Sequence, residues 1–245
     1  LILEGLKTPN GKPAGIDYLE ELGITHVQLM PVADFTSVDE ENVEAYYNWG
    51  YDPGHFSLPE GSYSSNPNDP YSRVKELREA IEGFHSKGIR VILDVVYNHL
   101  QDRLNSDFEK IVPNYYFRLS DSGAPSNGSF CGNDFDSSRA MARKIIIDSL
   151  RRWVVKYDVD GFRFDLMGIF DLETMNLAEK IIHELKPDAL LYGEGWDLPT
   201  LLDPALKANL PNQDKLPKIG QFNDYFRDQL KGDSAVEAIG AQGLL

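Results

Sequence analysis

The feature that most constrains this chain is a repeated alternation of helical and strand-like segments. Helical periodicity is followed by a short apolar run, and glycine or proline separates the two. This alternation is typical of βαβ units, in which parallel strands lie buried beneath helices. The strands are predicted at residues 24–32, 89–96, 159–166, 189–193 and 219–222. The helices are predicted at residues 13–22, 72–87, 138–157 and 171–185, with another from residue 225.

Long polar loops follow the predicted strands, whereas the turns that precede strands are short. Residues 33–71 follow the first strand, and residues 99–137 form a short irregular insertion after the next. In a (β/α)8 TIM barrel the active site is built from the loops at the strand C-termini. We therefore predict a TIM barrel, with a doubly wound open sheet as the alternative. The sequence contains neither a G-x-x-x-x-G-K-[ST] motif nor a G-x-G-x-x-G after a strand, so nucleotide binding is not indicated.

The composition narrows the classes of partner. The chain has 245 residues and a formal net charge of −15, which disfavours nucleic acid and anionic membrane surfaces. Its apolar runs fall short of the ~18 residues of a membrane span. Cys131 is the single cysteine, which excludes an intrachain disulfide and says nothing about compartment. Localisation and oligomeric state are therefore not predicted.

The strand at residues 159–166 carries the strongest chemical signal. Side chains alternate across a strand, so Arg163 and Asp165 share one face while Phe162 and Phe164 share the other. An adjacent cation favours the ionised carboxylate, which suits a nucleophile. A purely structural ion pair remains an alternative for this segment alone.

Polar and aromatic residues also collect where the other strands end. A histidine after a strand is more often structural, and a Tyr/Trp cluster is more often packing. Their gathering at one edge of one sheet instead favours a site, because parallel strands end together. The residues are Trp49, Tyr51 and Asp52 in the first long loop, Asp94, Asn98 and His99 at the second strand, and Glu194 and Trp196 at the fourth.

Asp165 and Glu194 end consecutive strands, so their carboxyls are expected to approach one another. Retaining glycosidases use two carboxyls ~5–5.5 Å apart, one as nucleophile and one as acid/base. Glu194 has no cation beside it in the sequence, so the Asp165 charge and the apolar Trp196 should favour its protonated form. We therefore assign Asp165 as nucleophile and Glu194 as acid/base. Tyr51 and Trp49 could stack on the apolar faces of sugars.

Metal binding is the competing interpretation of the same strand ends. Asp94, Asn98, His99 and Asp165 could supply oxygen and nitrogen ligands. No HExxH motif, EF-hand or Cys/His pair supports this interpretation, so we predict no catalytic metal and no cofactor for the chemistry.

Several motifs resemble one known family. The chain contains the segments DVVYNH, GFRFDLMG and YGEGW. These segments resemble three of the four short conserved regions of the alpha-amylase family, glycoside hydrolase family 13. The segment YNWGYDP resembles the hallmark of the type I pullulanase subgroup of this family. The segments PEGSYS and CGND resemble the same subgroup. Members of this family often bind calcium outside the site, and the sequence locates no such site here.

The resemblance implies an endo-acting hydrolase that cleaves α-1,6 links in pullulan and in branched starch or glycogen, with retention. It places the nucleophile on Asp165 and the acid/base on Glu194. The partner it implies is an α-glucan polysaccharide. The residues that it places in substrate contact or loop shaping are Arg163, His99, Tyr51, Asp52, Trp196, Asn98 and Asp94.

The chain departs from the family at its fourth region, which supplies a His-Asp pair. None of the five histidines is followed by aspartate. By register, the strand at 24–32 matches barrel strand two and Ile219 begins strand six. Residues 1–245 are therefore predicted to form a partial catalytic barrel of strands two to six, which we expect to be poorly folded or inactive alone.

Three other functions stay open. Isoamylase-like debranching and α-1,4-acting amylase activity are the alternatives within enzymes, and release of maltotriose rather than panose from pullulan would separate them from the main prediction. A non-catalytic barrel that binds glucan is the third. The presence of Asp165, Glu194, Arg163 and His99 favours an enzyme, because relatives that have lost catalysis generally lose the carboxylates.

Overall fold

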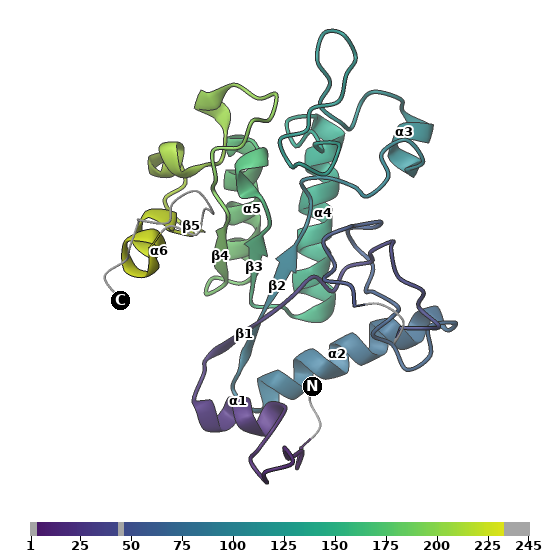
Figure 1. Ribbon diagram of the computed structural model, residues 1–245, viewed down its shortest axis with the longest axis vertical. Helices are drawn as coiled ribbons and strands as arrows, with labels where there is room; N and C mark the ends of the chain where they lie inside the picture. The colour runs from purple at the N-terminus through teal and green to yellow at the C-terminus, as the bar shows by residue number, and fades with distance from the viewer. Residues whose placement is uncertain (1–3, 44–46, 233–245) are drawn as a thin grey trace.

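The computed structural model describes residues 4–43 and 47–232 (Figure 1). Within them one parallel sheet follows the chain in the order β1-β2-β3-β4-β5. The strands are β1 (His26–Leu29), β2 (Arg90–Val95), β3 (Gly161–Phe164), β4 (Leu190–Gly193) and β5 (Gly220–Gln221). The helices are α1 (Ile16–Leu22), α2 (Pro70–Ser86), α3 (Asp107–Ile111), α4 (Ala140–Tyr157), α5 (Leu172–Leu185) and α6 (Asp224–Lys231), with short 3₁₀ turns η1 (Met167–Ile169), η2 (Pro204–Leu206) and η3 (Leu210–Lys215).

The strand order decides between the two predicted architectures. A doubly wound sheet reverses its strand order at a switch point. Here each strand pairs in parallel with the next one along the chain, from Val27 opposite Val91 to Gly193 opposite Gln221. The structure therefore confirms an incomplete TIM barrel, in which β1 and β5 are the edges of the described sheet.

The predicted segments match the observed elements to within a few residues, and side-chain caps explain one shift. The prediction started α2 at residue 72, but the helix begins at Pro70 because the Asp69 carboxylate accepts the Tyr71 N–H at 3.0 Å. Asp171 caps α5 in the same way, through the Thr174 N–H at 2.9 Å. These caps satisfy backbone donors that the first helical turn leaves open.

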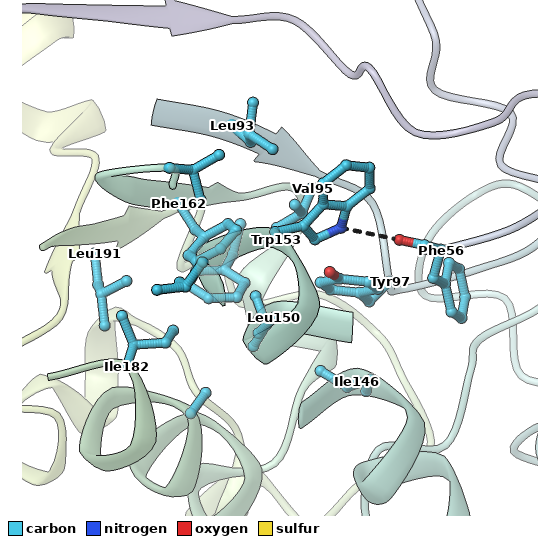
Figure 2. Packing of buried hydrophobic residues seen from close by; sticks show 14 of the residues in the cluster. Phe56, Leu93, Val95, Tyr97, Ile146, Leu150, Trp153, Phe162, Ile182 and Leu191 are labelled. Atoms are coloured by element: carbon cyan, nitrogen blue, oxygen red, sulfur yellow. Dashed lines mark hydrogen bonds between the residues drawn. The ribbon is translucent and has the colours of Figure 1, made fainter. Parts of the chain in front are cut away.

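The apolar faces of the strands pack against α4 and α5, which lie side by side (Figure 1). Phe162 and Phe164 are fully buried there, as the alternation along β3 predicted. Trp153 of α4 joins the same core, and its indole N–H donates to the Phe56 carbonyl at 3.1 Å (Figure 2). This bond fixes the first long loop, which contains Phe56, against α4.

The segment at residues 99–137 is mostly irregular, as predicted, and it also contains the short helix α3. It is anchored where β2 ends. The Leu100 N–H donates to Asn133 Oδ1 at 3.1 Å, and Asn133 Nδ2 donates back to the Leu100 carbonyl at 2.7 Å. The Phe135 N–H donates to the Asn98 carbonyl at 2.8 Å. The insertion therefore forms part of the wall around the strand C-termini.

The other end of the sheet carries a buried ion network just before β3. The Asp160 carboxylate accepts from the Val91 N–H at 2.8 Å, and lies 2.7 Å from His85 Nε2 and 2.8 Å from Lys186 Nζ. Burial opposes ionisation, but the hydrogen bonds from Lys186, Val91 and His85 outweigh it and lower the pKa of Asp160. The network ties α2, β2 and the end of α5 together.

None of the helices in the described ranges is both long and apolar enough to cross a lipid bilayer.

Candidate active site

Arg163 is the centre of a charged group at the strand C-termini. Its Nη1 lies 2.9 Å from Asp94 Oδ1 and 2.8 Å from Asp165 Oδ1, and its Nη2 lies 2.6 Å from Glu194 Oε1. The side chain is only 9% exposed. Carboxylates from β2, from the residue after β3 and from the residue after β4 thus converge on one guanidinium.

The contact with Glu194 corrects one premise of the sequence analysis, that Asp165 alone has a cation beside it. The sequence places a cation beside Asp165 and none beside Glu194, whereas in the structure Arg163 forms an ion pair with each of them. The reason is the register of neighbouring strands, which pairs Arg163 with Tyr192 and lets its long side chain reach the end of β4. Proximity of Arg163 therefore cannot distinguish the nucleophile from the acid/base.

A backbone donor also holds Glu194. The Leu166 N–H donates to Glu194 Oε2 at 3.1 Å, so both carboxylate oxygens are engaged. Leu166 has φ 41° and ψ 48°, a left-handed conformation that is costly for a residue with a side chain. It follows Asp165 directly, which places this strained turn between the two carboxyls. Sequence reasoning missed this donor, because a backbone amide carries no residue-type signal.

The Asp165 carboxylate is fixed through both oxygens as well. Oδ1 contacts Arg163, and Oδ2 accepts from Asn98 Nδ2 at 2.9 Å. Asn98 is fully buried, and its amide also donates to the Asp165 backbone carbonyl at 2.9 Å. Charge-assisted bonds of this kind set the orientation of a carboxylate. Asp165 itself keeps a small exposed fraction, 8%, through which a ligand can reach it.

Asp94 connects Arg163 to Tyr51. The Tyr51 hydroxyl donates to Asp94 Oδ2 at 2.8 Å. Burial raises the pKa of Asp94 to about 6, although Arg163 and the Tyr51 bond oppose this. Burial and the bond to Asp94 raise the pKa of Tyr51, which keeps the phenol protonated. The predicted sugar-stacking ring is therefore held at a fixed orientation by a strand carboxylate.

His99 lies within the same group, 2% exposed. Its Nδ1 is 2.6 Å from Asn98 Oδ1, and its Nε2 is 3.1 Å from the Tyr51 carbonyl. Burial lowers the pKa of His99, although the Asp165 charge and the Tyr51 carbonyl oppose this. Protein groups occupy both ring nitrogens, and the ring joins the first long loop to the end of β2.

Asp52 is not brought into the charged group. Its Oδ2 accepts from the Ser37 N–H at 2.8 Å and from Asn48 Nδ2 at 3.3 Å, and all three residues belong to the first long loop. The residue next to Tyr51 therefore shapes the loop that presents the ring. Sequence adjacency to Tyr51 could not reveal this, because neighbouring side chains in an irregular loop point in unrelated directions.

The aromatic residues divide between the site and its periphery. Trp196 is half-buried, and the Arg227 guanidinium carbon lies 6.0 Å from its ring centre. Trp49 is 63% exposed and meets Tyr47 edge to face. The Phe222 ring centre lies 5.7 Å from the Arg163 guanidinium carbon. Sequence reasoning missed Phe222 and Arg227, because α6 and the residue after β5 show no motif in the primary structure that points to the site.

One acidic cluster in the described residues has the spacing of metal ligands, with oxygens within 4.8 Å of one another. It comprises Asp34, Glu40 and Glu60 in the first long loop. Each already has a protein partner, so the cluster is explained as a structural network. The partners are His55 for Asp34, Arg73 for Glu40, and the Phe35 and Ser62 N–H groups for Glu60.

Comparison with known proteins decides the family. A family model described as the catalytic domain of alpha amylase matches residues 10–121. A pullulanase of Bacillus subtilis is 53% identical over 228 residues, covering 93% of this chain and 32% of that protein. The chain belongs to the alpha-amylase family.

Solved structures agree with this assignment. The crystal structure of pullulanase from Paenibacillus barengoltzii, in complex with maltohexaose and alpha-cyclodextrin, matches with a TM-score of 0.96 and 48% identity, covering 99% of this chain and 38% of that one. Type I pullulanase from Bacillus subtilis, complexed with maltose, matches with a TM-score of 0.96 and 51% identity, covering 99% and 34%. This alpha-amylase family chain thus spans about a third of the length of the relatives it matches.

Isoamylases are also related, at lower identity. Isoamylase 3 of Oryza sativa subsp. japonica is 32% identical over 248 residues, covering 91% of this chain and 31% of that protein. The chain is therefore more similar to the pullulanases than to this isoamylase.

Proposed function

We propose that this chain supplies the catalytic carboxyls of a retaining glycoside hydrolase that cleaves α-1,6-glucosidic links in pullulan and in branched starch or glycogen. The observation that carries the proposal is the binding of Asp165 and Glu194 to the two terminal nitrogens of one guanidinium. Two carboxyls held this way lie side by side, and retaining enzymes need a separation of only ~5–5.5 Å. The pullulanase relatives supply the substrate class: one is complexed with maltohexaose and alpha-cyclodextrin.

The reaction proceeds in two displacements. Asp165 attacks the anomeric carbon, the bond to the glycosidic oxygen breaks, and protonated Glu194 gives its proton to that leaving oxygen. Water then attacks the glycosyl–Asp165 ester while ionised Glu194 accepts the proton of that water, which restores both carboxyls. Each carboxyl returns to its starting state, and the product keeps its anomeric configuration.

The surrounding contacts suit this sequence of steps. Arg163 and the Leu166 N–H hold the Glu194 carboxyl in a fixed orientation beside Asp165. Arg163 and Asn98 keep Asp165 aimed during the first. Tyr51 offers a ring fixed by Asp94 for the sugar that is attacked. Preorganised donors of this kind need no rearrangement as charge develops.

The pullulanase specificity rests on similarity, and the site geometry alone would serve any retaining alpha-amylase family enzyme. Identity of 53% to a pullulanase against 32% to an isoamylase supports α-1,6 cleavage of pullulan over the isoamylase-like alternative. The intact carboxylate group likewise gives no support to a non-catalytic glucan-binding role.

The test compares the wild-type natural protein with Asp165→Asn and Glu194→Gln variants on pullulan. Each substitution keeps the side-chain volume and removes the charge, and kcat should fall by at least about 10³-fold. Chromatography should show maltotriose as the wild-type product, and NMR should show the α-anomer forming first.

Binding provides the control. Both variants should still bind maltotriose, because the sugar-facing Tyr51 and the fold are unchanged. Release of panose, an initial β-anomer, or a variant with undiminished kcat would each contradict the proposed function.

A further inference from the structure

The residues that follow β4 carry both Glu194 and Trp196. Backbone hydrogen bonds hold the first of them: the Glu194 N–H donates to the Phe164 carbonyl of β3, and the Glu194 carbonyl accepts from the Gly168 N–H, both at 3.1 Å. We call residues 194–203 the Glu194 loop. A shift of about one ångström at a reacting group costs about 100-fold in rate. What holds this loop therefore bears directly on the chemistry of Glu194.

Thr200 is the point at which the Glu194 loop meets the insertion at residues 99–137. Its hydroxyl donates to Asp134 Oδ2 at 2.7 Å and accepts from Arg118 Nη1 at 2.8 Å. Thr200, Asp134 and Arg118 are 6%, 0% and 4% exposed. One hydroxyl thus lies between a buried anion and a buried cation, and we call these three residues the Thr200 bridge.

The insertion side of the bridge is rigid. Asp134 also accepts from the N–H groups of Gly128 and Ser129 at 2.9 and 2.8 Å, and from the Ser126 hydroxyl. Burial opposes ionisation, but the hydrogen bonds outweigh it and lower the pKa of Asp134. Ser126 accepts in turn from the Leu201 N–H at 3.0 Å, which adds a second link to the Glu194 loop.

Close backbone packing reinforces these links. A Cβ placed on Gly128 would lie 2.6 Å from the Thr200 nitrogen, so the two backbones touch with no room for a side chain. The same insertion is bonded to the end of β2 through Asn133 and Leu100. Hydrogen bonds therefore run from the wall beside Asp165, through the insertion, to the loop that carries Glu194.

We propose that Thr200 is a positioning residue, whose hydroxyl holds the Glu194 loop against the insertion and so sets the distance of Glu194 from the leaving-group oxygen. The proposal rests on the proposed function, since it concerns the proton that Glu194 delivers. Nothing in it requires Thr200 to touch the substrate.

The test is Thr200→Val in the complete natural protein. Valine matches the shape of threonine but can neither donate to Asp134 nor accept from Arg118. Those two keep other partners, namely the Gly128 and Ser129 N–H groups for Asp134 and the Ile169 carbonyl for Arg118, so the variant should fold. Two substrates are compared: pullulan, and a 2,4-dinitrophenyl α-maltotrioside, whose leaving group departs without a proton.

A misplaced acid affects only the substrate that needs the proton. Thr200→Val should therefore lose about tenfold in kcat on pullulan, with KM nearly unchanged, and less than about twofold on the dinitrophenyl substrate. Thr200→Ser keeps the hydroxyl and should restore most of the rate on pullulan. Equal losses on both substrates, or no loss on pullulan, would overturn the proposal.

Thr174→Val is the matched control. Thr174 is fully buried, and its hydroxyl likewise lies between an aspartate, Asp171 Oδ2 at 2.7 Å, and an arginine, Arg143 Nε at 2.9 Å. It lies in the first turn of α5 and does not belong to the Glu194 loop. This variant should lower thermal stability without making the losses on the two substrates unequal.

Two further outcomes are distinguishable. If Thr200→Val fails to fold, Ser126→Ala carries the same test, because it removes the link to the Leu201 N–H and should show the same dependence on leaving group. If the wild-type protein releases no maltotriose from pullulan, the proposed function fails. A wild-type protein that is active, with variants that lose equally on both substrates, refutes the role of Thr200 alone.

Discussion

The two ends of the parallel sheet carry ion networks that differ in what surrounds each carboxylate. At the N-terminal end, the Asp160 carboxylate contacts Lys186 and His85 and accepts a hydrogen bond from a backbone N–H. Despite burial, these contacts lower its pKa. At the C-terminal end, Arg163 meets three carboxylates, and burial raises the pKa of one of them, Asp94, to about 6. The same residue types thus form a stabilising cluster at one end and an acid-rich group at the other.

This difference in surroundings indicates at which end of the sheet a carboxyl can act on a substrate. An anion with an excess of donors is satisfied and has little to offer a substrate. Carboxyls that share one cation instead lie side by side, which is the arrangement that a two-carboxyl mechanism requires. This division agrees with the general rule that barrel enzymes place function at strand C-termini and stability at the other end.

Among the changes that test this comparison, Arg163→Lys should have the largest effect. A lysine ammonium is a point charge and cannot bind Asp165 and Glu194 through two fixed nitrogens, so kcat on pullulan should fall at least about 100-fold. Lys186→Arg, the matched swap of cation in the Asp160 network, should change kcat less than about twofold. Similar losses in the two variants would break the distinction between the two ends.

The next effect concerns pH. Because the pKa of Asp94 is raised in the folded state, that state holds a proton between about pH 4 and 6 that the unfolded chain has released. Acidification from pH 7.5 to 4.5 should therefore stabilise wild type relative to Asp94→Asn, by about 2 kcal/mol. Urea unfolding across this range measures it, and parallel curves for the two proteins would contradict the prediction.

A smaller effect is expected at the opposite end. Asp160→Asn keeps the shape but removes the charge that faces Lys186 and His85, and should cost about 1–2 kcal/mol of unfolding free energy at pH 7. The pKa of Asp160 is lowered, so this contribution is present above the usual carboxyl pKa and is lost as the pH falls through the folded-state pKa. The slope is thus opposite to that of Asp94. Urea unfolding of wild type and Asp160→Asn at pH 7 and at pH 3.5 measures the cost of the substitution and its loss at low pH. An altered kcat in the folded variant would argue against a purely stabilising role.

Much of the site could be predicted before any coordinates, because parallel strands bring their C-terminal residues to one edge. The placement of Asp94, Arg163, Asp165 and Glu194 at this edge follows from the strand pattern alone. The contacts of Asp52 could not be predicted, because it lies in an irregular loop where no period fixes side-chain direction.

Periodicity and motif by themselves determined the parallel barrel-type sheet and the residues at its strand ends, since an alternation of period two or 3.6 encodes which face is buried. Tertiary structure alone decided that Arg163 is shared by Asp165 and Glu194, that the Leu166 N–H points at Glu194, and that Thr200 joins two distant loops. Those contacts depend on inter-strand register and on loops packing against each other. Both arise only when segments far apart in the sequence meet.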